Sequence, residues 1–424
     1  MLKYFLKNTV LLFVLVLISC GSNSKQDQIK NNEILKQVQD NKNVIVGANQ
    51  TSKYLPLLEG KRVGIVANQT SVIFNSEGYT HIVDSLVSLK VNITQVFAPE
   101  HGFRGKADAG EKVVDGFDAK TGIPIISLYS KNKKPKLEQI SETEKYEGDI
   151  EKGVYKIDIM VFDLQDVGAR FYTYISTLHY VMESCAENNI PLLILDRPNP
   201  NGHYIDGPVL EPEHYSFVGM HPVPVVYGMT IGEYAQMING EKWLMNSVVC
   251  DITVIPIKNY THQKAYSLPI KPSPNLPNDV AINLYPSLCF FEGTNVSAGR
   301  GTDKQFQVFG SPFLNSEISP YTYEFIPKPN EGAKYPKHEN KVCFGVDLSN
   351  SVRLDRLELN YLIGAYQFTE DKEEFFNDFF IKLAGTKKLQ QQIESQLNEN
   401  EIRASWIIGL KSFEKMRSKY LIYE

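Results

Sequence analysis

The chain has 424 residues, more than one ordinary hydrophobic core accommodates, so two folded units are expected. Its hydrophobic content of 42% and charged content of 22% are typical of a globular protein in water. The net charge is −5, and no basic run is dense enough for a nucleic-acid footprint, so nucleic-acid binding is set aside.

The first twenty residues have the pattern of an export signal. Lys3 and Lys7 precede the apolar core Val10–Ile18, which is too short for a comfortable membrane span. The core leads into Ser19, Cys20 and a glycine, which resembles a bacterial lipobox with Cys20 as the lipidated residue. We therefore expect an exported protein anchored by lipid in the cell envelope and facing the periplasm. The alternative is an ordinary signal peptide with an incidental cysteine.

The remainder divides into a tether and two domains. Residues 21–43 are polar and are expected to hold the folded part away from a membrane surface. Residues 44–260 alternate β-branched runs with helical patterns, which predicts an α/β fold with a largely parallel sheet. Residues 261–424 begin with a Pro- and Asn-rich crossing segment and then predict a smaller α+β domain.

Individual elements follow from hydrophobic periodicity. Strands are predicted over 61–67, 91–98, 123–128, 157–162, 192–195 and 341–348. Helices are predicted over 79–89, 171–187, 357–367, 377–384 and 402–420. The cysteines beyond the signal form no CxxC pair, so they are predicted to be small buried hydrophobic residues rather than zinc ligands: Cys185, Cys250, Cys289 and Cys343.

Four predicted strands end in polar clusters that the sheet would bring to one edge. The clusters are Asn68-Gln69, Glu100-His101 followed by Arg104, Asp163/Gln165/Asp166 followed by Arg170, and Asp196-Arg197. Helix capping explains any single cluster about as well as ligand binding does. Four clusters on one edge are better explained by one ligand site, and Glu100 is predicted to be its chemical centre.

Several common sites are not supported by the sequence. It contains no G-x-G-x-x-G after the first strand, no G-x-x-x-x-G-K-[ST], no G-x-S-x-G and no H-E-x-x-H. Dinucleotide binding, nucleotide triphosphate binding and α/β-hydrolase chemistry are therefore disfavoured. A metal site would have to be assembled from distant carboxylates.

The second half contributes a Gly-punctuated loop over 291–302. The loop contains Glu292, Asn295 and Arg300, and it follows a Ser-Pro-Asn stretch that ends at Asn275. It is either a flexible surface loop or a binding loop. A Gly-flanked arginine such as Arg300 favours close approach to an anionic ligand.

These motifs as a set resemble the exo-β-N-acetylmuramidase family from about residue 45 onward. The blocks are Pro99–Gly105 (PEHGFRG), Ala109–Glu111 (AGE), Asp163–Ile175 (DLQDVGARFYTYI), Asp196–Pro200 (DRPNP), Ser273–Asn275 (SPN) and Glu292–Thr302 (EGTNVSAGRGT). One departure is the run DKQFQVFG over 303–310, where a Pro-Phe-Glu-like run is expected, so substrate contacts there are expected to differ.

The resemblance implies a Rossmann-like N-terminal domain, a smaller C-terminal domain and a cleft between them. It implies hydrolysis that releases N-acetylmuramic acid from the non-reducing end of peptidoglycan fragments, either muropeptides or disaccharides. Glu100 falls where the family has its catalytic glutamate. No cofactor and no metal ion are expected.

Glycosidic cleavage commonly uses two carboxyl groups. Glu100 is the predicted acid with His101 beside it, and Glu111, Asp163, Asp166 and Asp196 are open as partners. The substrate's own acetamide is another possible nucleophile. The predicted substrate-binding residues are Asn68, Arg104, Gln165, Arg170, Tyr172, Asp196, Arg197, Asn275, Glu292, Asn295 and Arg300. Among them, Arg104, Arg170, Arg197 and Arg300 are available for the lactyl carboxylate of muramic acid.

Two other functions stay open at this point. One is a non-catalytic lipoprotein that binds cell-wall sugars. The other is a metal-dependent hydrolase that uses Asp163, Asp166 and Asp196.

Overall fold

The structure is a computed structural model, and it describes residues 44–105, 111, 113–129, 132–140, 156–314, 319–370 and 372–424. A seven-stranded sheet has the order β5-β6-β4-β1-β7-β8-β9, and its neighbours are parallel except for the pair β5 and β6. Its strands are β1 (Arg62–Ala67), β4 (Asn92–Ala98), β5 (Gly116–Phe117), β6 (Pro124–Ser127), β7 (Ile159–Asp163), β8 (Leu192–Leu195) and β9 (Ile252–Ile255). The predicted α/β class and largely parallel sheet are confirmed.

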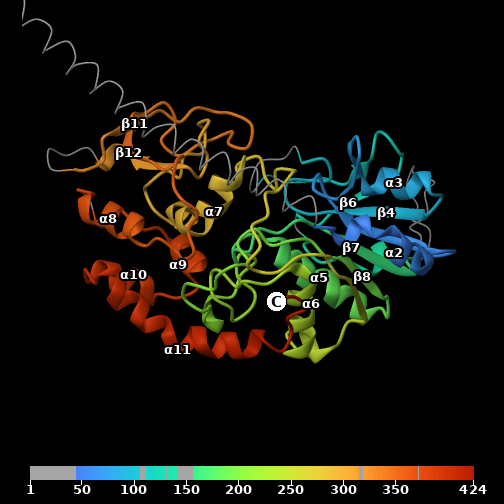
Figure 1. The fold of residues 1–424 in the computed structure, drawn as a ribbon. Helices are drawn as coiled ribbons and strands as arrows, with labels where there is room; N and C mark the ends of the chain where they lie inside the picture. Colours follow the sequence, from blue (N-terminus) through green and yellow to red (C-terminus); the bar gives the residue numbers. More distant parts are fainter. Residues whose placement is uncertain are drawn as a thin grey trace, which may run out of the picture.

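Helices cover both faces of this sheet, so its central strands are apolar on both sides. Alternate side chains of β1 face opposite ways: Ile65 packs in the core with α2 (Thr51–Leu58) and α3 (Ile82–Ser88). Val66 packs in the core with α5 (Tyr174–Glu187) and α6 (Ile231–Gly240). Figure 1 shows α5 and α6 together beside the sheet, with α2 and α3 at its other side.

One predicted helix is partly wrong. Residues 79–89 contain only the short helix α3, because the preceding residues form a hairpin of β2 (Val72–Asn75) and β3 (Gly78–His81). Tyr79 and Thr80 pair across the hairpin with Phe74 and Ile73, and such aromatic and β-branched residues favour strands. The hairpin β2–β3, β5, β9, α2 and α6 were not predicted. The helices at Leu137–Ile140, Asp279–Leu288 and Lys388–Glu394 and the strands at Val308–Ser311 and Tyr323–Phe325 were not predicted either.

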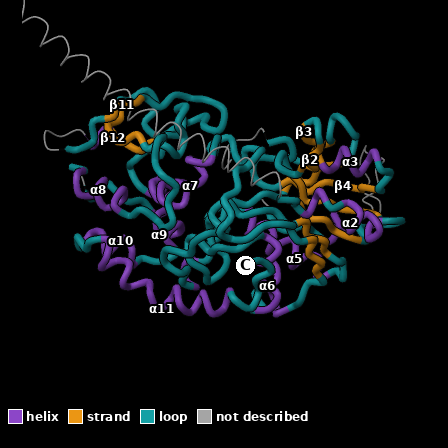
Figure 2. The backbone as a smooth tube through the Cα atoms, viewed as in Figure 1, coloured by secondary structure: helices purple, strands orange, loops and turns teal. Residues whose placement is uncertain are grey.

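The second half combines a small antiparallel sheet with helices. The sheet has the order β10-β12-β11. Its strands are β10 (Val308–Ser311), β11 (Tyr323–Phe325) and β12 (Cys343–Asp347), and the helices are α7 (Asp279–Leu288), α8 (Asn360–Phe368), α9 (Asp378–Ala384), α10 (Lys388–Glu394) and α11 (Glu399–Arg417). A short helix, α4 (Leu137–Ile140), lies in the first half. Figure 2 shows long irregular segments between the large sheet and the C-terminal helices. The domain boundary at residue 260 stays a prediction.

The segment after α11 returns to the first half of the chain. Tyr423 Oη donates a hydrogen bond of 2.7 Å to Asp196 Oδ2 at the end of β8. The same hydroxyl accepts from the Ile257 backbone N at 2.8 Å. The two halves are therefore joined at this point as well as through the crossing segment.

The four predicted buried cysteines are buried and unpaired. Within the described part of the chain, no helix has the length and apolar character needed to cross a membrane. The predicted export signal, Cys20 and the tether over 21–43 lie outside the described residues.

Candidate active site

A cavity of about 260 Å³ adjoins the carboxyl end of β4, and both halves of the chain line it. Its polar side chains include Glu100, His101, Thr173, Asn275, Glu292 and Arg300. Its apolar and aromatic walls include Tyr129, Phe171, Tyr172, Val218, Leu276, Tyr285, Phe306, Phe379 and Leu383. An apolar pocket with a few convergent polar groups is the usual form of a small-molecule site.

A tight turn brings Glu100 and His101 to this cavity. The backbone N of Gly102 donates to the Pro99 carbonyl at 3.0 Å, which closes a four-residue turn directly after β4. His101 has a φ of 69° within this turn, a value that residues other than glycine adopt rarely, and its side chain is buried. Such a conformation is held by its surroundings and is often found at functional sites.

Thr173 holds the Glu100 carboxylate. Its hydroxyl donates a 2.7 Å hydrogen bond to Glu100 Oε2. Thr173 is the N-cap residue of α5, yet its side chain caps no backbone N–H of that helix. A side-chain cap typically contributes about 1 kcal/mol, so the helix forgoes this stabilisation while the hydroxyl orients the carboxylate.

Tyr129 forms a second contact with Glu100. Burial raises the pKa of the Tyr129 hydroxyl, and the charge of Glu100 and a hydrogen bond to it act in the same direction. Lys133 lies beside Tyr129, with Nζ 4.5 Å from the centroid of its ring. Burial lowers the pKa of Lys133, while the charge of Glu100 opposes that shift. Both side chains therefore lie within the electrostatic reach of Glu100.

The wall from the second half contains a carboxylate and a guanidinium. Arg300 Nη1 lies 3.5 Å from Glu292 Oε2, and Arg300 Nη2 donates to the Gly332 carbonyl at 3.0 Å. Asn275 Nδ2 donates to the same carbonyl at 2.7 Å. Arg300 Nε and Asn275 Oδ1 are buried and have no hydrogen-bond partner among the described residues. These two unsatisfied groups, one donor and one acceptor, are available to a polar ligand.

Lys337 fixes the loop that carries Glu292. Its Nζ donates to the backbone carbonyls of Phe291 and Val296 at 2.8 and 3.1 Å, and to that of Thr294 between them. Burial lowers the pKa of Lys337, and the charge of Glu292 opposes the shift. A loop held by three such bonds is ordered by its own chain rather than by a ligand.

Of the sequence-predicted residues, six line the cavity: Glu100, His101, Tyr172, Asn275, Glu292 and Arg300. Tyr172 is fixed by a 2.8 Å hydrogen bond from its hydroxyl to the Pro272 carbonyl. Among the described residues that line the cavity, Glu292 is the one carboxylate besides Glu100. From the sequence, Glu292 was predicted to bind substrate, and other acids were open as partners of Glu100.

The other predicted acids are buried away from the cavity lining, and each has its own partners. Asp163 accepts two hydrogen bonds from Arg197, at 2.6 and 2.9 Å. Burial raises the pKa of Asp163, and the Arg197 charge opposes the shift. Asp166 accepts from Tyr227 Oη and from the Gly168 N–H, and burial raises its pKa to about 7.

Asp196 is also engaged internally. It accepts hydrogen bonds from Tyr423 Oη and Thr230 Oγ1, both at 2.7 Å, and burial raises its pKa to about 6. Asp163, Asp166 and Asp196 thus point to separate partners and do not form one shared ligand set. This placement does not support the metal-dependent hydrolase.

The remaining predicted residues also lie outside the cavity lining. Glu111 forms a 2.6 Å ion pair with Lys334, and Arg104 forms one of 2.9 Å with Asp118. Several others bond within the protein: Asn68 to Tyr174 Oη, Gln165 to the Pro198 carbonyl, Arg197 to Asp163, and Asn295 through its carbonyl to His338. Arg170 is wholly buried and donates to four backbone carbonyls. Their places in the structure are those of scaffold residues.

Sequence reasoning did not name Tyr129, Thr173 or Lys133. Thr173 stands between two strongly patterned tyrosines and has the ordinary appearance of a helix N-cap. Tyr129 and Lys133 follow a short predicted strand, and no motif includes them. Only their interactions with Glu100 in the folded chain distinguish these side chains.

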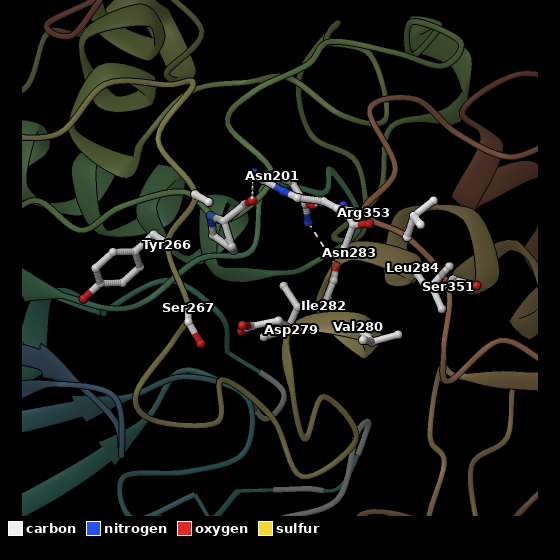
Figure 3. A pocket seen from close by; sticks show the side chains of 13 residues that line it. Asn201, Tyr266, Ser267, Asp279, Val280, Ile282, Asn283, Leu284, Ser351 and Arg353 are labelled. Carbon is white, nitrogen blue, oxygen red and sulfur yellow. Dashed lines mark hydrogen bonds between the residues drawn. The ribbon is translucent and has the colours of Figure 1, made fainter. Parts of the chain in front are cut away.

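A second cavity, also of about 260 Å³, lies between the loop after β8, α7 and residues 351–353 (Figure 3). Two of its polar groups are paired with a neighbouring side chain or with the backbone. Asn283 Nδ2 donates to Asn201 Oδ1 at 3.1 Å, and Arg353 Nη2 donates to the Pro200 carbonyl at 3.0 Å. This cavity has no counterpart of the carboxylate pair Glu100 and Glu292, so it is not the candidate active site.

Comparison with known proteins identifies the family of this chain. Residues 63–280 match the model of the exo-β-N-acetylmuramidase NamZ N-terminal domain, and residues 283–423 match that of its C-terminal domain. The chain is 38% identical over 388 residues to the peptidoglycan β-N-acetylmuramidase NamZ of Bacillus subtilis (strain 168), covering 87% of this chain and 89% of that protein.

Two crystal structures of DUF1343 family proteins from Bacteroides fragilis are similar to the fold. One is 44% identical with a TM-score of 0.77, and the other is 27% identical with a TM-score of 0.73. Each comparison covers 90% of this chain and 99% of the solved chain. Because the two domain models together span most of the sequence, the chain belongs to the exo-β-N-acetylmuramidase NamZ family.

Proposed function

We propose that this protein is an exo-acting glycoside hydrolase that releases N-acetylmuramic acid from the non-reducing end of peptidoglycan fragments. The observation that carries the proposal is Glu100, held by Thr173 in a cavity that both halves of the chain line. A few convergent polar groups and aromatic walls line this cavity of about 260 Å³, which is the usual form of a small-molecule site. Family membership and the B. subtilis relative support the same activity.

Glu100 is the proposed general acid. It would give its proton to the glycosidic oxygen as the bond to the sugar in the cavity breaks. Glu292 is the proposed second carboxylate, because it lines the same cavity and Arg300 lies beside it. It would act as a base on water, as a nucleophile on the anomeric carbon, or by orienting the acetamido group of the substrate. Inversion of the anomeric configuration in the product would indicate the first role, whereas the second role gives retention.

Arg300 is the proposed partner of the lactyl carboxylate. Of the four arginines considered from the sequence, it is the one that lines the cavity. Its guanidinium has an Nε without a hydrogen-bond partner among the described residues, and a carboxylate would satisfy that donor. The lactyl group distinguishes N-acetylmuramic acid from N-acetylglucosamine, so this contact would set the specificity.

Arg300→Gln is expected to lower kcat/KM for a chromogenic N-acetylmuramic acid glycoside about a hundredfold, as loss of a charge-assisted pair would. The corresponding N-acetylglucosamine glycoside lacks the carboxylate, so its low rate should change little. Steady-state kinetics on both substrates measures the preference. An equal loss on both glycosides would show that Arg300 acts through Glu292 or through the fold rather than on the lactyl carboxylate.

The alternative of a non-catalytic sugar-binding lipoprotein predicts saturable binding of cell-wall sugars without turnover. The pair of carboxylates in one cavity favours catalysis over binding alone. Release of free N-acetylmuramic acid by the wild-type protein, followed by mass spectrometry, decides between the two.

We further propose that the protein is exported and anchored through lipid on Cys20, facing the periplasm. The support is the signal pattern of Lys3, Lys7, the apolar core and the lipobox-like Ser19-Cys20. Cys20→Ser is expected to move the protein from the membrane fraction to the soluble fraction and to abolish incorporation of a labelled fatty acid. An unchanged distribution and no label in the wild type would contradict the anchor.

A further inference from the structure

A groove of about 560 Å³ adjoins the active cavity on the side of Tyr129. Residues 132–137 line it, together with Tyr180, Glu187 and Asn188. Tyr129 and Val218 belong to the active cavity, and Lys133 and Tyr180 belong to the groove. Because Lys133 contacts Tyr129, this pair forms the boundary between the two hollows.

Aromatic rings hold Lys133 at this boundary. Its Nζ lies 3.5 Å from the centroid of the Phe217 ring and 4.5 Å from that of the Tyr129 ring. Tyr180 stacks against Phe217, with ring centroids 6.2 Å apart and an interplanar angle of 14°. Cation–π contacts of this kind restrict an otherwise flexible lysine, so its ammonium group is positioned before a ligand arrives.

The other two lysines of the groove already have acidic partners. Lys134 forms ion pairs of 2.7 Å with both Glu183 and Glu187. Lys136 lies 3.4 Å from Glu138. Across the described ranges, no carboxylate forms an ion pair with Lys133, although its charge is within reach of Glu100. Lys133 is therefore the lysine of this groove that has no ion pair with a carboxylate among the described residues.

The proposed function defines which part of the substrate reaches this position. The sugar to be released fills the cavity, and the bond to be broken lies at Glu100. The rest of the substrate must then continue past Glu100 and out of the cavity, and the groove beyond Tyr129 offers it a path. We propose that Lys133 binds a carboxylate on this leaving fragment. The inference rests on the proposed function.

The ligand chemistry is thus a carboxylate on a saccharide or on a peptide attached to it. A leaving fragment that is only N-acetylglucosamine has none. A longer fragment has one on the lactyl group of its next N-acetylmuramic acid or, when that group is substituted, on the attached peptide. Lys133 would therefore favour longer, charged fragments over the disaccharide.

The test compares three substrates: the disaccharide N-acetylmuramyl-N-acetylglucosamine, the tetrasaccharide with two such units, and the tetrasaccharide with a peptide on its internal muramic acid. Lys133→Met is expected to lower kcat/KM about tenfold on the charged leaving fragments, the size of one charge-assisted hydrogen bond. The disaccharide should lose clearly less than the charged fragments, because its leaving group has no carboxylate for Lys133 to bind. The wild-type advantage on charged fragments should shrink as salt rises, because the contact lies at a solvated groove. Lys411→Met, at an exposed lysine of α11 that lines neither hollow, is the matched control and should behave as the wild type.

The outcomes separate the possible explanations. A loss on the unsubstituted tetrasaccharide identifies the lactyl carboxylate, and a loss on the peptide-bearing one alone identifies the peptide. An equal loss on the disaccharide would overturn the proposal, since Lys133 would then act through Glu100. No loss on any substrate would also overturn it. Absence of turnover by the wild type on all three would instead refute the proposed function.

Discussion

Glu100→Gln is expected to reduce release of a chromogenic group from an N-acetylmuramic acid glycoside by at least about a thousandfold, while the protein folds normally. Glutamine keeps the shape of the side chain and can still accept from Thr173, but it has no proton to give to the leaving oxygen. Initial rates and a thermal unfolding curve on the same preparation measure both parts of this expectation.

A control substitution at another glutamate tests whether the loss of activity is specific to Glu100. Glu138→Gln alters an exposed glutamate on α4 whose partner is Lys136, and it should leave the rate unchanged. Glu292→Gln should also lose activity if the cavity works with two carboxylates. Retained activity in Glu100→Gln would refute the assignment of the acid, whereas joint loss of activity and folding would make it a structural residue.

Arg170→Met is expected to lower the free energy of unfolding by about 4 kcal/mol or more, because four buried carbonyls would lose their donor. Arg170 Nη1 donates to the carbonyls of Pro208 and Val223, and Nη2 donates to those of Leu383 and Ala384, over 2.7–2.9 Å. The first pair of acceptors lies in the first half of the chain and the second at the end of α9. Burial lowers the pKa of this guanidinium, and no carboxylate pairs with it among the described residues.

Urea unfolding tests this expectation, with the midpoint shifting while the slope stays constant. Arg170→Lys should fall between the wild type and Arg170→Met, since a single ammonium group cannot reach all four carbonyls. The substrate-binding role considered from the sequence predicts the opposite pattern, with a normal midpoint and a raised KM.

The sequence predicted the class of the fold because its buried strands are continuous apolar runs, as in Ile159–Phe162. It did not predict the hairpin β2–β3, since Tyr79 and Thr80 precede a helical pattern without a break. Nor did it predict β9, which has partly exposed residues and a weak alternation. The order of strands across the sheet depends on contacts between distant segments, which local patterns do not contain.

Polar residues at the ends of neighbouring strands meet, as expected, but they bond to one another where a shared ligand site was predicted. Gln165 N donates to Thr70 Oγ1, and Arg197 pairs with Asp163, so neighbouring clusters satisfy one another. A buried sheet edge needs such pairing because unsatisfied polar groups are costly there. Glu100 and His101 instead reach the cavity through their turn. Whether an aspartate faces an arginine or a ligand depends on side-chain direction, which composition and spacing do not determine.

The contact between Tyr423 and Asp196 can form only late during synthesis of the chain. These residues are 227 positions apart, and Tyr423 satisfies an acid at the end of a central strand. A chain that leaves the ribosome from its N-terminus therefore has the strands of the large sheet long before it has the side chain that completes their edge. Contacts of such sequence separation form late and slow the search for the native state. Until Tyr423 has left the ribosome, the donors to Asp196 are Thr230 Oγ1 and the backbone N–H groups of Arg197 and Gly232.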